Sequence, residues 1–106
     1  MPQPDVVLFK PRADFYAAKK PTPEDVLLVV EVSDSTLSYD RKIKLPRYAA
    51  AGIPEFWIED LKHDLLLVHR EPAGNNYATL LTLHKGDSIS VAAFPEVVFK
   101  VDDFLG

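Results

Sequence analysis

Residues 26–32 read Val-Leu-Leu-Val-Val-Glu-Val, an apolar run that contains one carboxylate, Glu31. A continuous run of branched aliphatic residues is typical of a strand that is buried on both faces. An ionised carboxylate in such a strand costs free energy unless a cation, a metal ion or hydrogen-bond donors compensate it. The stretch therefore predicts the central strand of the fold, and Glu31 is the residue whose partners have to be found.

Size and composition limit the fold and the kinds of site. The chain has 106 residues, of which 47% are hydrophobic, so we expect residues 1–106 to form a single small domain. It has no cysteine, which excludes a disulfide framework and a thiolate metal site. No apolar stretch approaches the roughly 18 residues of a membrane helix, and the N-terminus lacks the pattern of a signal peptide. We expect a cytoplasmic protein with no membrane partner.

The segments next to the central strand predict one strand and one helix. Residues 5–9 form an apolar run typical of a short strand, and residues 10–24 contain three prolines, which predicts a loop. Ser38 is a suitable N-cap for a helix that runs to about Ala51 and ends before a glycine and a proline. Pro46 lies in the middle of this helix and is expected to kink it.

The second half of the chain has the pattern of antiparallel hairpins. Strands are predicted at residues 55–60, 65–71, 77–84 and 88–92, separated by short turn sequences. The tail, residues 97–105, has two short apolar pieces that are expected to pack on the edge of the core. The order of elements predicts an α/β (α+β) fold, in which a mixed sheet carries one main helix after the Glu31 strand and hairpins at the C-terminus.

Two carboxylates converge if the first two strands are neighbours. Side-chain alternation puts Glu31 and Ser33 on one face of the central strand and Asp5 on one face of the first. Two carboxylates, a backbone carbonyl and water form the oxygen-rich shell that Mg²⁺ or Mn²⁺ prefers. A lysine beside such a metal can orient or deprotonate water, or stabilise charge on a phosphate. This is the chemistry of phosphodiester hydrolysis.

At these residues the chain resembles the PD-(D/E)XK, or restriction-endonuclease-like, superfamily and within it the bacterial Uma-type family. The resemblance covers essentially the whole chain and includes its C-terminal part. It is carried by four motifs: Pro4-Asp5, Val30-Glu31-Val32-Ser33, the spacing Asp40-x-x-x-Lys44-x-x-x-Tyr48, and residues 51–60, which read Ala-Gly-Ile-Pro-Glu-Phe-Trp-Ile-Glu-Asp.

The resemblance implies a catalytic and metal-binding set. Asp5 and Glu31 correspond to the metal-binding acids, with the backbone carbonyl of Val32 as a third ligand. Ser33 stands where the superfamily has a lysine, so Lys44 on the following helix is nominated in its place. The alternative for Glu31 is a buried acid that is neutralised by a structural partner such as Lys44.

Two further residues on the helix have supporting roles under this resemblance. Tyr48 would contact substrate or orient Lys44, and Asp40 would position Lys44 through a pair four residues apart. Structural alternatives stay open for all three: Asp40 interacts well with the helix dipole, Lys44 resembles a surface lysine with a buried stem, and Tyr48 resembles a core aromatic.

Basic residues near these motifs are candidates for contacts with nucleic acid, although most surface charges are simply solvated. The net charge of −4 disfavours nonspecific attraction to nucleic acid. The candidates are Lys10, Arg12, Lys19, Lys20 and Arg41.

The resemblance implies a Mg²⁺-dependent endonuclease, or one using Mn²⁺, that hydrolyses DNA and forms a homo-oligomer, a dimer in the first instance. Family members are usually longer and carry a helix and strands before the Pro-Asp motif, so we expect this chain to lack part of the family fold. The alternative is a catalytically inactive remnant that acts through self-association or partner binding at exposed sheet edges.

Overall fold

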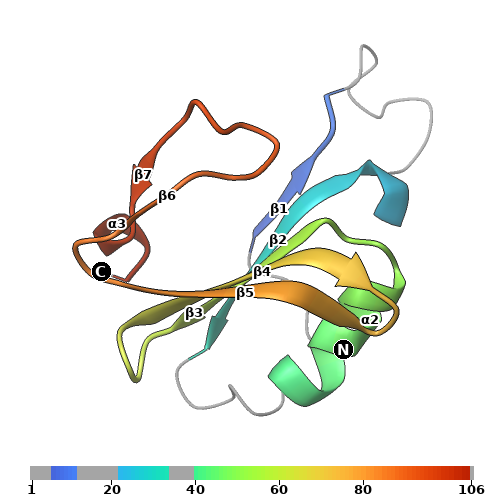
Figure 1. Cartoon of the computed structure of the whole chain (residues 1–106), viewed down its shortest axis with the longest axis horizontal. Coiled ribbons are helices and arrows are strands. Elements are labelled where there is room, and N and C mark those ends of the chain that lie inside the picture. The colour runs from blue at the N-terminus through green and yellow to red at the C-terminus, as the bar shows by residue number, and fades with distance from the viewer. Residues whose placement is uncertain (1–5, 12–21, 34–39, 106) are drawn as a thin grey trace.

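The computed structural model describes residues 6–11, 22–33 and 40–105, with the side chains of residues 40 and 41 left out (Figure 1). These residues form a five-stranded sheet in the order β1-β2-β3-β4-β5. β2 and β3 are parallel, and the other neighbouring pairs are antiparallel. The strands are β1 (Val6–Phe9), β2 (Val26–Ser33), β3 (Glu55–Asp60), β4 (Leu65–Ala73) and β5 (Asn76–His84).

The remaining elements are short. A 3-10 turn, η1 (Pro23–Asp25), precedes β2, and α2 (Leu45–Ala50) lies between β2 and β3. At the C-terminus a small antiparallel pair, β6 (Ser88–Ile89) and β7 (Phe99–Lys100), is followed by α3 (Asp102–Leu105). The mixed α+β architecture predicted from the sequence is confirmed, although the strand predicted at residues 88–92 is reduced to two residues.

The helical segment after β2 differs from the single kinked helix that was expected. Residues Asp40–Lys44 form a π-helical turn, η2, and the α-helix begins only at Leu45. Pro46 therefore lies in the first turn of α2, where its missing N–H and fixed φ are tolerated. The change of helix type falls directly before the proline, inside a helical segment that spans residues 40–50. The predicted N-cap, Ser38, lies outside the described residues.

The helix ends at a glycine and is fastened to the sheet. Gly52 has φ of 77°, a left-handed conformation that suits glycine, and Ile53 N–H donates to the carbonyl of Tyr48 at 3.0 Å. The hydroxyl of Tyr77 on β5 donates to the carbonyl of Ile53 at 2.8 Å. Burial raises the pKa of Tyr77 above its usual range, so the phenol stays a neutral donor.

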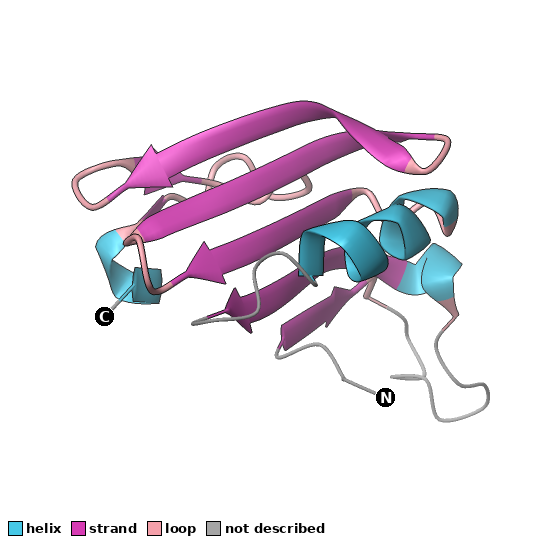
Figure 2. Cartoon of the chain, turned by 90° about the horizontal axis from the view of Figure 1, so that it is seen from below, coloured by secondary structure: helices cyan, strands magenta, loops and turns pink. Residues whose placement is uncertain are grey.

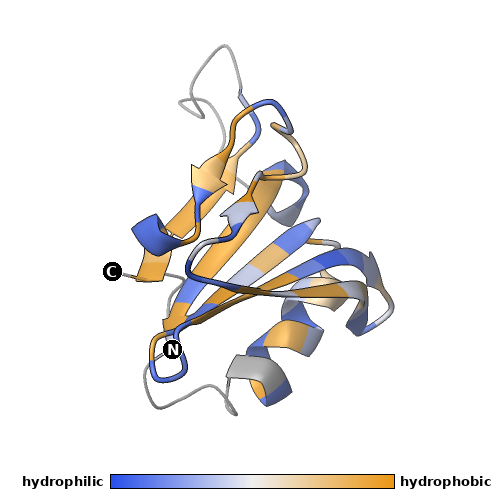
Figure 3. Cartoon of the chain, turned by 60° about the vertical axis from the view of Figure 1, so that its left-hand side comes forward, coloured by the Kyte–Doolittle hydropathy of each residue, from blue (hydrophilic) through white to orange (hydrophobic). Residues whose placement is uncertain are grey.

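Apolar clusters lie on both faces of the sheet, because α2 covers one face and the β6-β7 pair and α3 cover part of the other (Figures 1 and 2). Consecutive residues of β3 point to opposite faces, and its three large apolar residues are buried: Phe56 and Ile58 toward α2, Trp57 toward α3. The hydropathy colouring shows apolar residues gathered in the sheet and interrupted by polar positions (Figure 3). Burial on both faces explains the apolar residues of β2 on either side of Glu31 and the run Phe56–Ile58 in β3.

A buried polar network attaches the C-terminal segment to the sheet. The carboxylate of Glu55, only 1% exposed, accepts hydrogen bonds from Trp57 Nε1 at 2.6 Å, Arg70 Nε at 2.9 Å and the N–H of Ala92 at 2.8 Å. Arg70 also donates to the carbonyl of Ser90. The charge of Glu55 is thus fully compensated, and its role is structural.

Within the described part of the chain, the helices are too short or too polar to cross a membrane.

Candidate functional site

Glu31 lies on β2, the second strand of the sheet, between β1 and β3, and its side chain is 3% exposed. Lys44 Nζ donates to its Oε2 at 2.7 Å, and the Tyr48 hydroxyl donates to its Oε1 at 3.0 Å. Both carboxylate oxygens are therefore bonded, one by a cation and one by a neutral donor. Glu31 and Lys44 meet as an ion pair, which is the structural alternative given for Glu31, and Tyr48 bonds to the same carboxylate. The predicted second carboxylate, Asp5, lies outside the described residues.

Chain connectivity explains why these three side chains meet. The crossover from β2 through α2 returns to the parallel strand β3, so the start of the helical segment lies near the carboxyl ends of both strands. Lys44 and Tyr48 are one helical turn apart and project on the same side. Glu31 shares a face of β2 with Val29, which packs against Leu45 and Ala49 of α2. In open α/β sheets, ligands bind at the carboxyl ends of parallel strands.

Beyond Glu31 on the same face, the ends of β2 and β3 bring two polar residues side by side. Ser33 and Asp60 are direct partners in the parallel register and are 1% and 2% exposed. The buried Ser33 Oγ has no hydrogen-bond partner among the residues that the structure describes. Asp60 Oδ2 lies 2.9 Å from Nδ1 of His63 in the following turn.

Sequence reasoning missed this second group. His63 was assigned no function, and Asp60 was treated as the last residue of a strand. The available signal was an acid at the end of a buried strand with a histidine three residues later. That pattern is weak, because the chain also contains an exposed pair of the same spacing, His84 and Asp87.

Other predicted site residues are only partly described. Asp5, Arg12, Lys19 and Lys20 lie outside the described residues, and so do the side chains of Asp40 and Arg41. β1 and β2 are neighbours, as expected, with Val7 opposite Val29 on the α2 face. Lys10 is exposed just after β1. The roles assigned to Asp5 and to the Val32 carbonyl stay predictions.

The Glu31 carboxylate is a type of ligand that divalent cations accept. In this structure both of its oxygens already accept hydrogen bonds, from Lys44 and Tyr48. A carboxylate is a suitable ligand for Mg²⁺ or Mn²⁺, and Lys44 would have to share or yield Oε2 if a metal bound there. Across residues 6–11, 22–33 and 40–105, three or more His, Cys, Asp or Glu side chains are nowhere grouped closely enough to hold a metal ion. Any further acidic ligand has to come from outside these ranges, as Asp5 would.

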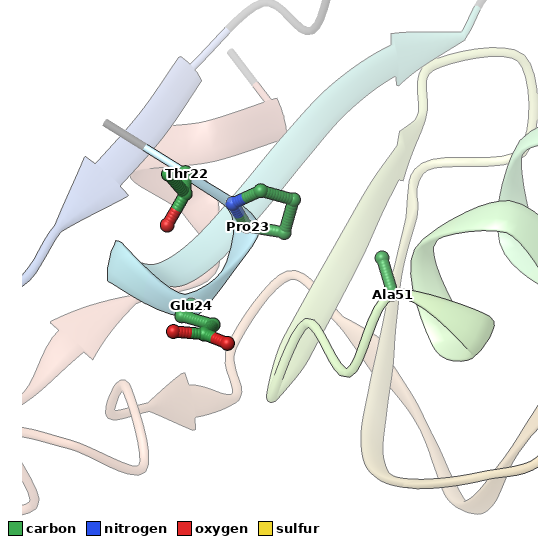
Figure 4. Close-up of a pocket in the computed structure, with 4 residues that line it drawn as sticks. All are labelled: Thr22, Pro23, Glu24 and Ala51. Carbon is green, nitrogen blue, oxygen red and sulfur yellow. The ribbon is translucent and has the colours of Figure 1, made fainter. Parts of the chain in front are cut away.

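A surface hollow of about 310 Å³ lies elsewhere, between η1 and the C-terminal end of α2, lined by Thr22, Pro23, Glu24 and Ala51 (Figure 4). These residues precede β2 and follow α2, so the hollow is at the opposite end of the β2-α2-β3 unit from Lys44 and Ser33. It is separate from the candidate site.

Fold and site together define a small α+β domain built on a β2-α2-β3 crossover, with a buried carboxylate–lysine pair under the first turns of the helical segment. The family model Uma2, described as "Putative restriction endonuclease", matches residues 1–102, and the chain belongs to this family. The description of the family is that of a nuclease. No curated protein and no solved structure gives a significant match.

Proposed function

We propose that the protein is a metal-dependent endonuclease that hydrolyses DNA phosphodiester bonds. The observation that carries the proposal is the buried ion pair between Glu31 and Lys44, 2.7 Å apart, in a chain of a restriction-endonuclease family. A lysine and a carboxylate held together beside the carboxyl ends of two parallel strands are suited to phosphoryl chemistry.

Each residue has a defined task in this proposal. Glu31, with Asp5 and the carbonyl of Val32, would hold Mg²⁺ or Mn²⁺, which when bound polarises the phosphate and lowers the pKa of water. Lys44, held at a fixed position by Glu31, donates to the phosphate oxygens as negative charge develops on them. Tyr48 holds the Glu31 carboxylate in its orientation.

Contacts with the DNA backbone would come from basic residues, because phosphate contacts position the duplex without reading its sequence. The candidates are Lys10, Arg12, Lys19, Lys20 and Arg41. Lys10 follows β1 beside the start of β2, at the other end of that strand from Glu31.

Cleavage of supercoiled plasmid in the presence of Mg²⁺ or Mn²⁺ tests the proposal. We expect Glu31→Gln and Lys44→Met each to lower the rate by about 10²–10⁴, the usual contribution of a positioned catalytic group. The matched control is Lys42→Met, a change of an exposed lysine in the same helical turn, which should keep the activity. Circular dichroism verifies folding of each variant. Equal cleavage by the folded Glu31 and Lys44 variants and the control would contradict the assignment.

A second candidate function is self-association of a catalytically inactive domain, and β1 favours it. This edge strand reads Val-Val-Leu-Phe and has no charged residue, although charges and prolines commonly protect exposed edges. Val6 and Leu8 are 48% and 36% exposed and line a groove of about 200 Å³ that continues to Trp57 and Phe99. We propose that β1 of a second copy of this chain pairs with this edge. Two chains of net charge −4 repel each other, and the repulsion is least where the contact surface is an uncharged strand.

A further inference from the structure

The β3-β4 turn lies at the same end of the sheet as the Glu31–Lys44 pair. In the parallel register Glu31 is level with Ile58, and Asp60 follows two residues later on the same face of β3. Two residues of a strand span about 7 Å, which is about the rise of two nucleotides along one strand of B-DNA. The turn after Asp60 is therefore within reach of a duplex that is held at Lys44.

His63 in this turn is fastened to a buried carboxylate. The side chain of Asp60 is 3% exposed, its Oδ2 lies 2.9 Å from Nδ1 of His63, and its Oδ1 accepts a hydrogen bond from the His63 N–H at 3.3 Å. Because an ionised carboxylate only accepts hydrogen bonds, the contact assigns a hydrogen to Nδ1, and Nε2 is the nitrogen left for other contacts. The imidazole is 59% exposed, so Asp60 fixes one side of a ring whose other side reaches solvent.

The charge of Asp60 favours a protonated His63. Within the described ranges 6–11, 22–33 and 40–105, the hydrogen bonds to the Asp60 carboxylate come from His63 alone. A buried carboxylate costs free energy unless a cation compensates its charge. Protonated His63 supplies that cation and then has a second N–H, at Nε2, on the solvent side of the ring. Charged N–H groups of this kind bind phosphate oxygens.

A second histidine–aspartate pair of the same spacing gives an internal comparison. His84 ends β5 and Asp87 stands in the following turn, and the ring nitrogen and carboxylate oxygen of this pair are 3.3 Å apart. Asp87 is 45% exposed, and the hydrogen bond from the N–H of His84 holds the pKa of its carboxyl below the usual range. Water can compensate the charge of Asp87, so this pair does not depend on a protonated ring.

We propose that His63, oriented by Asp60, binds a backbone phosphate of DNA through its Nε2–H. The inference rests on the proposed nuclease function, because it adds a contact to the same substrate at the end of the sheet where Lys44 lies. The contact requires the protonated ring, so it is present at low pH and is lost as the pH rises through the range in which imidazole titrates. The β5-β6 turn lies at the same end, since Leu65 pairs with His84. The other charged or titratable residues of the two turns are Lys62, Asp64, His84, Lys85 and Asp87, of which Asp64 and Lys85 lie 3.9 Å apart.

Binding of a fluorescently labelled DNA duplex to the whole protein, measured by anisotropy in EDTA, tests the contact without cleavage. We expect His63→Gln to weaken binding about two- to fivefold at pH 6, the usual contribution of an exposed ion pair, and to have no effect at pH 8. The salt dependence of binding at pH 6 should fall by about one released counterion. The matched control is His84→Gln, which should bind as the unchanged protein does at both pH values.

A permanent cation at the same position completes the test. His63→Arg should bind the duplex at pH 8 about two- to fivefold more tightly than the unchanged protein does. His84→Arg controls for the added charge and should gain less. Both histidines are exposed, with side chains 59% and 67% exposed, so these variants should fold. Equal gains at the two positions, or unchanged binding by His63→Gln at pH 6, would overturn the proposal.

The contact and the proposed nuclease can fail separately. Binding that does not depend on His63, together with cleavage that depends on Glu31 and Lys44, would overturn the contact and leave the nuclease. Affinity that depends on His63, together with equal cleavage by the Glu31 and Lys44 variants and their control, would do the reverse. The lack of any DNA binding at both pH values would overturn both.

Discussion

Glu31 and Lys44 are both largely removed from water, with side chains 3% and 11% exposed. Taking two charges out of water is costly, and their attraction offsets this cost only while both partners and their hydrogen bonds are present. The Tyr48 hydroxyl supplies the remaining bond to the carboxylate. The pair is therefore a poor source of stability in itself.

Replacing one partner of this ion pair should destabilise the protein more than replacing both partners by apolar residues. We expect Lys44→Met to lower the free energy of unfolding by about 3–5 kcal/mol, because Glu31 is then buried without its cation. The double variant Glu31→Leu with Lys44→Met should recover much of that loss. Urea denaturation of both, with Lys42→Met as an exposed control, measures the difference. A loss for Lys44→Met as small as that of the control would show that solvent, and not Lys44, compensates Glu31.

The helical segment between β2 and β3 positions the site through its two different turns. The π-helical turn Asp40–Lys44 carries Lys44, and the α-helix Leu45–Ala50 carries Tyr48 and the apolar residues that pack on the sheet. Turns of π-helix occur frequently at functional sites. Here the π-helical turn ends at Lys44, the residue that contacts Glu31, and the regular helix begins at the next residue, Leu45.

Pro46 should be nearly neutral for stability, since it occupies the first turn of α2. We expect Pro46→Ala to change the free energy of unfolding by less than about 1 kcal/mol, because no intrahelical hydrogen bond is missing there. Gly52→Ala should cost about 1 kcal/mol, because φ of 77° is unfavourable for a residue with a Cβ. Thermal or urea unfolding measures both. A gain of about 3 kcal/mol in Pro46→Ala would instead indicate a proline inside the helix.

Across the whole molecule, the two edges of the sheet differ in chemistry. β5 alternates exposed and less exposed positions and carries threonines and a histidine, as expected of a solvated edge. β1 is apolar at every position, and three of its four residues are exposed. The exposed apolar surface on the β1 side is continued by Val98 and Phe99 near the C-terminus, 66% and 37% exposed.

Self-association through β1 can be tested with one charge at each edge. We expect Val6→Lys to reduce or abolish association, because it puts a charge beside the apolar groove. Leu80→Lys on β5 is the matched control, since Leu80 is 46% exposed and Val6 is 48% exposed. Sedimentation velocity over a range of concentrations compares both with the unchanged protein. Identical sedimentation of the unchanged protein and Val6→Lys would rule out this interface.

Local patterns in the chain were sufficient to identify the main elements. The strand predicted at 55–60 coincides with β3, and the strand predicted at 26–32 falls within β2. Apolar runs and helical spacing predict these features because they depend on near neighbours in the chain. The same periodicity placed Lys44 and Tyr48 on one side of a helix and singled out Glu31 as a charge in need of a partner.

Contacts between segments far apart in the chain decided the rest. The sequence left open whether the Glu31 carboxylate meets a metal ion or the ammonium group of a lysine. Packing of the helical segment puts Lys44 Nζ 2.7 Å from Glu31 Oε2. Ser33 and Asp60 are neighbours only through the parallel register of β2 and β3, which depends on how the intervening helix packs and has no local signal in the sequence. Local spacing can thus nominate candidate residues, whereas their pairing is a property of the folded sheet.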